Sequence, residues 1–357
     1  MLTSRRFWLG AAITAGFLAL LLAQVDYGEL GDALASAQYA YVVPAVVIYF
    51  GSLYFRSVRW RYMLRPFVAT RVSRLYPVVV VGYTANNLLP MRLGELVRSY
   101  YLSRREPVRG STALATIIVE RVFDGLTLLL FLAIGALFLP VSGLAERVSE
   151  DRGVPLWGIG TVVVVPFAAA LTLIALTALR PETARALAVR LALRLPGRVA
   201  RSAGRMAAGF IDGFEGLHHP RRLLTVLTLS APIWLAEGMM YYVLALGFGL
   251  DEPLGGRGAT IAAMLVVTAV SNLATSIPAS QGAVGPFEFF ATLSLVFLGV
   301  GTDLALAYAI VLHAALLLPV IGAGLLHLAM ARLSLGELTR GQRDQAPKAH
   351  VEANETE

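Results

Sequence analysis

Three charged side chains recur at helical spacing just beyond an apolar stretch of the sequence. Arg92, Glu95 and Arg98 follow the run YPVVVVGYTA and share one face of any helix that contains them. Ions inside a membrane are costly unless they are paired, and they usually line a pathway for a substrate or a proton. These residues therefore predict a polar site within an apolar chain. The same break in the sequence contributes further candidates: Asn86, Asn87, Pro90 and Gly94.

A second charged cluster lies in the segment ERVFD, where Glu120 and Asp124 are four residues apart and Arg121 lies between them. The spacing places both carboxylates on one helical face, where they could balance Arg92 and Arg98. Such a carboxylate pair also suits a divalent metal or a proton relay. A salt-bridge network that holds helices together at the cytoplasmic surface is an equally good interpretation, and the sequence leaves that choice open.

A third candidate region is the stretch SNLATSIPASQGAVGPFEFF, residues 271–290. Glu288 lies one turn into an apolar helix with no cation nearby in sequence, which makes it the least structural of the acids. Gly282 and Gly285 let backbone approach closely or expose amides to a headgroup, although glycines in membrane helices are as often packing contacts. Glu237, unpaired in IWLAEGMMYY, is a weaker candidate for a cavity wall. The stretch also supplies Asn272, Pro278 and Ser280.

Metal and cofactor sites are not expected, and no catalytic residue is assigned. The chain has no cysteine, which removes disulfides, thiol catalysis and thiolate metal sites. His313 and His327 have no companions at metal-ligand spacing, so we interpret both as packed, hydrogen-bonded histidines. The sequence has no aspartate-rich run of the kind that metal-diphosphate chemistry favours.

The composition defines the elements that must hold these residues. The chain has 357 residues, of which 57% are hydrophobic, and its mean hydropathy is +0.68. Several windows of about 18–25 residues carry almost no charge, which is the length needed to cross the hydrocarbon core. The formal charge of +7 comes almost entirely from arginine, and the positive-inside rule explains it better than nucleic-acid binding does. The sequence therefore predicts an all-α polytopic membrane protein.

Arginine-rich segments assign sides to the apolar windows. The segments 55–66 and 180–222 are rich in arginine, and both should face the cytoplasm. Three apolar windows lie between them, and an odd number of crossings cannot begin and end on one side. The first of these windows is the best candidate to turn back, because arginines flank both ends of 74–105. We therefore predict a re-entrant hairpin at 74–105, with 112–140 and 156–179 as full spans.

The second half of the chain repeats this pattern in the opposite sense. The loop after span 223–248 should lie outside and the basic tail inside, but one window too many lies between them. A second hairpin is therefore predicted at 258–300, entering from outside. The motif P-x-x-x-G occurs at both tips, beginning at Pro90 and Pro278, as in an inverted repeat of the transporter type. Facing hairpins imply a central polar cavity; kinked helices that cross completely are the alternative.

The predicted fold has about six full spans and two re-entrant hairpins among roughly eight to nine apolar segments. Both termini should be cytoplasmic, in the plasma (inner) membrane. Arginine alternates with leucine in 180–222, which is typical of a basic amphipathic helix on an anionic leaflet. The first membrane repeat is predicted within 1–179; it contains spans 7–25, 39–58 and 112–140 and hairpin 74–105, and 156–179 opens the second repeat. The cytoplasmic segment 180–222 follows. The rest of the second repeat occupies 223–331, with spans 223–248 and 303–331 and hairpin 258–300, and a disordered cytoplasmic tail is predicted in 332–357.

Three motifs together resemble a known family. They are N-x-x-P-x-R-x-G-E-x-x-R at 87–98, E-R-x-x-D at 120–124 and P-x-x-x-G-x-x-G-x-x-E at 278–288. The chain is similar to the flippase-like family, the transmembrane region of lysylphosphatidylglycerol synthetases, and looks like a stand-alone member without the soluble synthetase domain. Two departures from the family pattern are Met91, where glycine is expected, and Ala283, where a second glycine is common.

The resemblance implies a protein that moves or handles a lipid across the leaflets of the bilayer. We expect a transporter, not an enzyme, for an anionic phospholipid, glycolipid or polyprenyl-phosphate headgroup. Arg92 and Arg98 would contact phosphate with help from the amino termini of the hairpin helices. Glu95 and Glu288 would hold protons or gate access from opposite sides.

Two other functions stay open at the level of sequence. One is a membrane-embedded, metal-dependent lipid-phosphate transferase that uses the carboxylates of ERVFD. The other is a non-catalytic partner of the enzymes that synthesise envelope lipids. The expected ligands are anionic membrane lipids, nucleic acid is not expected, and the sequence does not define an oligomeric state.

Overall fold

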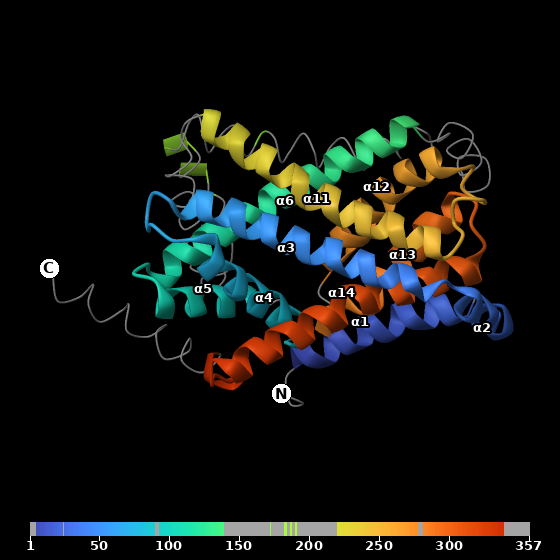
Figure 1. Ribbon diagram of the computed structural model, residues 1–357, viewed down its shortest axis with the longest axis horizontal. Helices are drawn as coiled ribbons and strands as arrows, with labels where there is room; N and C mark the ends of the chain where they lie inside the picture. The colour runs from blue at the N-terminus through green and yellow to red at the C-terminus, as the bar shows by residue number, and fades with distance from the viewer. Residues whose placement is uncertain are drawn as a thin grey trace, which may run out of the picture.

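The computed structural model describes residues 5–23, 25–89, 93–138, 220–277 and 281–338, with isolated positions between 172 and 190. These residues form a bundle of helices that run mostly along its long axis (Figure 1). The first half of the chain contains α1 Arg5–Leu22, α2 Tyr27–Ser36, η1 Tyr39–Tyr41, α3 Val42–Leu64, α4 Val72–Leu88, α5 Gly94–Arg105 and α6 Gly110–Phe138. The second half contains α11 Pro220–Gly247, α12 Arg257–Ala274, η3 Gln281–Ala283, α13 Pro286–Phe297 and α14 Thr302–Met330.

Four helices in this part of the chain are long and apolar enough to cross a membrane. They are Tyr39–Leu64, Arg221–Gly247, Arg257–Ala274 and Thr302–Met330. A fifth span results if Gly10–Leu22 and Tyr27–Ser36, which meet at 91°, are counted as one broken helix. The prediction of an all-α polytopic membrane protein is therefore confirmed. Which of the apolar helices cross completely stays a prediction, as do the repeat boundaries.

The helix that contains the second predicted span, 39–58, is longer than that span. The helix continues to Leu64, so Arg56, Arg59 and Arg61 lie within α3 and not in a flanking loop. The sequence has no helix breaker before Pro66, and the helix is free to continue once its arginines find partners on other helices. Arg56 and Arg59 are 3% and 0% exposed, which makes them interior residues.

Charge divides the bundle into two ends. At the left of Figure 1 lie the end of α3, the start of α4, the end of α5, the starts of α6 and α11, and the end of α14. We call this the arginine end, and its charged residues are Arg61, Arg65, Arg71, Arg74, Arg104, Arg105, Glu106, Arg109, Arg221, Arg222, Arg332 and Glu337. The opposite, acidic end carries Asp26, Glu29, Asp32, Asp251, Glu252, Arg257 and Asp303.

Hydrogen bonds between distant segments fix these two ends. At the acidic end, the amide of Gln38 donates to the carbonyl of Gly247 at 2.8 Å, and the amide of Asp26 donates to Asp303 at 2.9 Å. At the arginine end, Tyr101 of α5 hydrogen-bonds His327 of α14 at 3.1 Å. Such an asymmetry of arginine is what the positive-inside rule produces in a membrane protein.

The helices α4 and α5 form a hairpin that begins and ends at the arginine end. They pack side by side. At the base of the hairpin, Glu106 after α5 accepts a hydrogen bond from Thr70 before α4 at 2.9 Å, which joins the two segments. Their approach is closest near the tip, where a Cβ on Gly94 would overlap the carbonyl oxygen of Gly82 and the amide nitrogen of Asn86. Glycine at position 94 is therefore required by packing, as well as by any role in binding.

The helices α12 and α13 form a second hairpin, which begins and ends at the acidic end. Its turning segment requires left-handed backbone, with φ of +67° at Gly282 and +97° at Gly285. A side chain at Gly285 would also approach the backbone of Thr14 in α1 to about 3.0 Å. The glycines of this tip therefore serve conformation and close packing. At 18 residues, α12 is itself long enough to cross, although the prediction treats it as one arm of a re-entrant hairpin.

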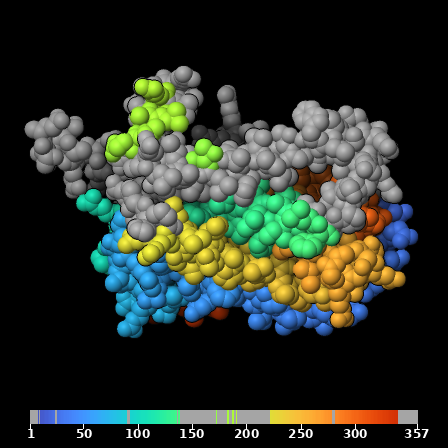
Figure 2. Space-filling view, turned by 90° about the horizontal axis from the view of Figure 1, so that it is seen from above, coloured from blue at the N-terminus to red at the C-terminus, as the bar shows by residue number. Residues whose placement is uncertain are grey.

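The two hairpin tips meet in the middle of the bundle. The element η3 packs against α4, and a Cβ on Gly282 would lie 3.7 Å from the carbonyl oxygen of Asn87. Around them, α6, α11 and α12 lie side by side on the face shown in Figure 2, and α3 packs along α11. The predicted span 156–179, the segment 180–222 and most of the tail 332–357 lie outside the described residues.

Candidate functional site

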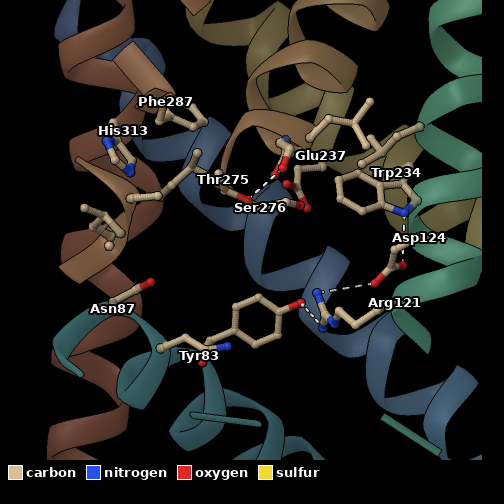
Figure 3. A pocket seen from close by; sticks show the side chains of 18 of the residues that line it. Tyr83, Asn87, Arg121, Asp124, Trp234, Glu237, Thr275, Ser276, Phe287 and His313 are labelled. Atoms are coloured by element: carbon tan, nitrogen blue, oxygen red, sulfur yellow. Dashed lines mark hydrogen bonds and ion pairs between the residues drawn. The ribbon is translucent and has the colours of Figure 1, made fainter. Parts of the chain in front are cut away.

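A polar cavity of about 400 Å³ lies where the two tips meet. The first tip contributes Asn86 and Asn87, and the second contributes Gly282 and Ala283. The rest of the wall comes from helices α3, α6, α11 and α14, together with the end of α4, the end of α12 and the start of α13 (Figure 3). Further lining residues used below are Tyr49, Arg56, Tyr83, Arg121, Asp124, Trp234, Glu237, Asn272, Thr275, Ser276, Phe287 and His313.

Arg56 of α3 is the central cation of the cavity wall. Its Nη2 donates to Oε2 of Glu237 at 2.7 Å, and its Nη1 lies 3.5 Å from Oδ2 of Asp124. The guanidinium carbon stands 4.7 Å from the ring centre of Trp234 and 5.4 Å from that of Tyr83, within the range of cation–π attraction. Glu237 is therefore paired, contrary to the expectation that it is unpaired, because its cation comes from a helix 181 residues away in sequence.

Asp124 of α6 is the anionic counterpart. Its Oδ1 accepts from Arg59 at 2.7 Å and from the indole nitrogen of Trp234 at 3.1 Å. Its Oδ2 lies 3.5 Å from both Arg56 and Arg121. The carboxylate is 4% exposed, so only this set of donors compensates for its lost hydration.

Glu120 lies one turn before Asp124 but faces a different arginine. Arg98 of α5 donates Nη1 to Oε2 of Glu120 at 2.7 Å and Nη2 to Oε1 at 3.3 Å, a two-pronged pair. The guanidinium carbon of Arg98 stacks 3.7 Å from the ring centre of Trp60. The sequence predicted that acids of the segment ERVFD could neutralise Arg98, and Glu120 does so. The two carboxylates do not converge on a shared point, as a metal pair would need.

Arg121 connects the first hairpin to this network. Its Nε lies 3.4 Å from Oε1 of Glu95, its Nη1 lies 3.5 Å from Asp124, and its Nη2 reaches the hydroxyl of Tyr83 at 3.5 Å. All three contacts are long, and the Glu95 side chain is 21% exposed. Arg121 is therefore the more loosely held of the two cavity arginines.

Glu288 and His313 form a separate pair on the other side of the cavity. Glu288 is the third residue of α13, after Gly285 as N-cap and Pro286 at the first helical position. Its Oε2 accepts from the amide of Gly285 at 2.7 Å, which is the one half of a capping box that a glycine N-cap allows. Its Oε1 lies 2.6 Å from Nδ1 of His313 in α14. The expectation that Glu288 is isolated is therefore wrong, because His313 is its partner.

Uncharged polar and aromatic groups complete the cavity. The amide of Asn272 donates to the hydroxyl of Tyr241 at 3.0 Å, and Thr275 and Ser276 follow it along the second hairpin. In Figure 3, Asn87 and His313 lie on one side of the cavity and Trp234 and Asp124 on the other. Hydrogen-bonding and aromatic side chains therefore face each other across one space.

The structure groups the predicted site residues unevenly. Those that line the cavity are Asn86, Asn87, Arg121, Asp124, Glu237, Asn272 and Gly282. Glu95, Arg98, Glu120, Gly94, Gly285 and Glu288 lie in the wall behind it, where they pair or pack. The predicted residues outside the described ranges are Pro90, Arg92, Pro278 and Ser280.

Five side chains of this site were not predicted as site residues: Arg56, Arg59, Tyr83, Trp234 and His313. The two arginines were assigned to the cytoplasmic edge of a span because arginine is common there. A signal was available, since Glu237 was a mid-span acid with no local cation, and an acid at that depth requires one. Aromatic residues in membrane helices are too common for Tyr83 and Trp234 to have stood out.

A helical bundle with an ion-paired cavity between two opposed hairpins is an integral membrane protein of the multi-pass class. More narrowly, the chain belongs to the lysylphosphatidylglycerol synthase TM region family, whose profile matches residues 7–324. The family resemblance noted in the sequence is therefore confirmed. No solved structure matches the chain.

Two curated relatives show how the chain relates to longer and stand-alone proteins. It is similar to a UPF0104 membrane protein of Methanothermobacter thermautotrophicus, with 26% identity over 82% of this chain and 86% of the relative. It is also similar to glycosyltransferase AglD of Haloferax volcanii, with 27% identity over 85% of this chain. The chain spans only 51% of the length of that glycosyltransferase.

Proposed function

We propose that the protein carries the headgroup of an anionic lipid between the two leaflets, through the cavity, while the lipid tails stay in the bilayer. The supporting observation is that hairpins from opposite ends of the bundle meet at one cavity of about 400 Å³. Small-molecule sites commonly have volumes of about 300–1,000 Å³. Non-helical backbone at mid-membrane that lines a polar space is also the arrangement found in transporters.

Arg56 and Arg121 are the proposed contacts for the phosphate of that headgroup. Both line the cavity, and guanidinium groups bind phosphate through paired, charge-assisted hydrogen bonds. Among the described residues, Nε of Arg56 has no hydrogen-bond partner. The carboxylates of Glu237 and Asp124 then act as exchangeable counter-ions, which neutralise the arginines in the empty cavity and yield when phosphate enters. This role replaces the one expected for Arg98, which is already held by Glu120.

A sugar-bearing lipid fits the remaining wall of the cavity. Amide and hydroxyl groups hydrogen-bond sugar hydroxyls, and aromatic rings cover the apolar faces of sugars; Asn87, Ser276, Trp234 and Tyr83 supply both kinds of contact. The similarity to a protein named as a glycosyltransferase supports a glycolipid or a polyprenyl-phosphate sugar over an ordinary phospholipid. We therefore place a phosphate-linked glycolipid first among the candidate ligands.

The arginine end is proposed to face the cytoplasm, with the carboxyl terminus on that side and α2 at the outer surface. Single cysteines at Arg109 and Glu252 test this cleanly, because the chain has no cysteine of its own. An impermeant maleimide should label Glu252→Cys in intact spheroplasts and Arg109→Cys only in inverted membrane vesicles. The reverse pattern would overturn the proposed orientation.

Exchange of labelled lipid in proteoliposomes tests the transport function. Acyl-NBD glycolipid and acyl-NBD phosphatidylglycerol should become accessible to dithionite faster in vesicles with protein than in vesicles without it. Arg56→Gln should slow exchange about 10- to 100-fold, the value of one charged hydrogen-bonded contact. Since that change also leaves Glu237 unpaired, the double variant with Glu237→Gln separates folding from binding and should be equally slow. Arg74→Gln, a control at a side chain that is 67% exposed, should exchange at the wild-type rate.

Two competing functions give different results in the same assay. Equal exchange in protein-containing and protein-free vesicles would remove the transporter proposal. Product formation that requires a divalent metal, without exchange, would favour a transferase, although Glu120 and Asp124 each face their own arginine. Dependence on an added soluble glycosyltransferase, without exchange, would favour a partner that presents lipid to an enzyme.

A further inference from the structure

We propose that His313 and Glu288 form a proton-binding site that couples lipid movement through the cavity to a proton gradient. The inference rests on the proposed transport function and adds an energy source to it. His313 lies on the side of the cavity opposite Arg121 (Figure 3), where α14 contacts the α13 arm of the second hairpin. His313 itself lines the cavity, and Glu288 lies directly behind it.

The pair differs from the other buried carboxylates of the described residues. Glu106, Glu120, Asp124 and Glu237 each have an arginine partner, and arginine keeps its proton throughout the physiological range. The cation in each of these pairs therefore has a fixed charge. Glu288 is paired with an imidazole, the side chain that gains and loses a proton near neutral pH. Of the buried ion pairs in this part of the chain, this one can change its net charge.

The geometry assigns the atom that takes the proton. Nδ1 of His313 is committed to Oε1 of Glu288 at 2.6 Å, and the other carboxylate oxygen accepts from the amide of Gly285. The imidazole ring is stacked on Phe287, with centroids 4.2 Å apart, which holds it in one orientation. When neutral His313 donates its Nδ1–H to ionised Glu288, Nε2 is unprotonated and the pair has a net charge of −1. A proton from water therefore adds at Nε2, and the pair becomes an imidazolium–carboxylate pair with no net charge.

The neighbouring helices provide few competing charges. The α13–α14 contact is surrounded by α1, α2, α3, α4, α11 and α12. Of these, α12 contributes uncharged Asn272 to the cavity wall, and Thr14 of α1 donates to the carbonyl of Val284, while the acids of α2 lie at the acidic end. The titratable or charged groups of the surrounding wall are Tyr49, Arg56, Tyr83, Arg121, Asp124, Glu237 and Tyr241. Its arginines and acids pair with one another, so a phosphate that binds the arginines adds a net negative charge to the cavity, and a proton on His313 can balance that charge.

Coupling follows from charge balance in a buried space. A phosphate-bearing headgroup brings negative charge into a cavity whose arginines are already neutralised, and an unpaired buried charge is costly. One proton on His313 offsets that charge, so headgroup and proton enter together and leave together. The pair also joins the hairpin to α14, so protonation alters the contact that must change when the cavity opens to the other side. The expected process is co-transport of about one proton per lipid.

The steady-state distribution of labelled lipid under a pH gradient tests this coupling. Proteoliposomes of phosphatidylcholine contain a trace of a phosphate-linked acyl-NBD glycolipid and are held at a gradient of about two pH units. Dithionite measures the fraction of this labelled lipid in the outer leaflet. Co-transport should enrich the label in the leaflet facing the alkaline side, up to about 100-fold for one proton per lipid. Internal pyranine should report proton entry only when lipid moves. Without a gradient, the label should divide equally.

His313→Asn keeps a hydrogen-bond donor for Glu288 but cannot take the proton. It should exchange lipid more slowly than wild type, because no proton offsets the charge of the headgroup, and it should leave equal label in both leaflets at every gradient. Glu288→Gln should lose the enrichment as well, and monodisperse elution of both variants shows that they fold. The matched control is His327→Asn, because His327 lies on the same helix and is bonded to Tyr101 away from the cavity. It should respond to the gradient like wild type.

The outcomes separate this inference from the function on which it rests. Wild-type exchange that stays symmetrical under the gradient would overturn proton coupling and leave the transport function standing. Enrichment that persists in His313→Asn would overturn the assignment of the site. Absence of wild-type exchange under every condition would overturn both.

Discussion

Replacing Asp124 with leucine should cost about 3–5 kcal/mol of stability, the usual penalty for breaking a buried ion pair on one side. The carboxylate accepts from Arg59 at 2.7 Å and from Trp234 at 3.1 Å, and it lies 3.5 Å from Arg56 and Arg121. Arg59 is 0% exposed, so loss of its partner leaves a charge that water does not reach. Domains are typically stable by only about 5–15 kcal/mol, so this one substitution threatens folding.

Thermal unfolding of the purified protein in detergent, followed by the loss of monodisperse elution, measures this effect. Asp124→Leu should unfold at a much lower temperature than wild type. Glu95→Gln is the contrasting variant, since its ion pair is long and partly exposed, and it should cost only about 0–1 kcal/mol.

A double variant distinguishes uncompensated charge from lost packing. Adding Arg59→Leu to Asp124→Leu removes the stranded cation, so the double variant should be more stable than Asp124→Leu alone. Equal or lower stability in the double variant would contradict the view that ion pairing is the reason these residues lie together. So would an Asp124→Leu protein as stable as Glu95→Gln.

Much of the fold could be predicted from the distribution of arginine along the sequence and from the residues that break helices. Alternating arginine-rich segments predicted that 74–105 turns back, and α4 and α5 do form a hairpin based at the arginine end. The break at 271–290 likewise predicted the second turn, where Gly282 and Gly285 have positive φ. These predictions rest on local properties, namely where charge accumulates and where helices cannot continue, and such properties can be read from one sequence.

The pairing of the charged residues could not be predicted in the same way. Arg98 and Glu120 were matched correctly because they are 22 residues apart on consecutive elements. Glu237 and Arg56 are separated by 181 residues, and nothing local indicates that α3 packs along α11. An acid placed in a span requires a cation, but the sequence does not say which helix supplies it.

Partner identity also changes how an acid is interpreted. Glu95 was expected to hold a proton or gate access, and this role stays a prediction; the structure shows that Arg121 holds it loosely at the cavity wall. Glu288 was expected to be isolated, and its contact with His313 makes it part of a pair with variable charge. The sequence identified both acids as unusual, whereas their chemistry depends on side chains brought together by the tertiary fold.

Joining the two hairpin tips should have a large effect on lipid exchange. Asn87 and Ala283 line the same cavity, and they belong to hairpins based at opposite ends of the bundle. If the headgroup passes between these tips, joining them should close the route. Ala283 already carries a Cβ at φ +59°, so a cysteine there keeps the existing backbone. The absence of native cysteine means that any crosslink joins these two positions.

The most direct measurement is lipid exchange by the double variant Asn87→Cys/Ala283→Cys before and after crosslinking. The crosslinker is short, reducible and thiol-reactive. Exchange of acyl-NBD glycolipid is followed by back-extraction with albumin, because dithionite would reduce the crosslink. Each single-cysteine variant treated with the same reagent serves as a control for modification alone and should still exchange lipid. Lipid exchange by the crosslinked double variant should fall to the rate in protein-free vesicles, and it should recover when the crosslink is reduced. Full exchange by completely crosslinked protein would contradict the claim that the headgroup moves between the two tips.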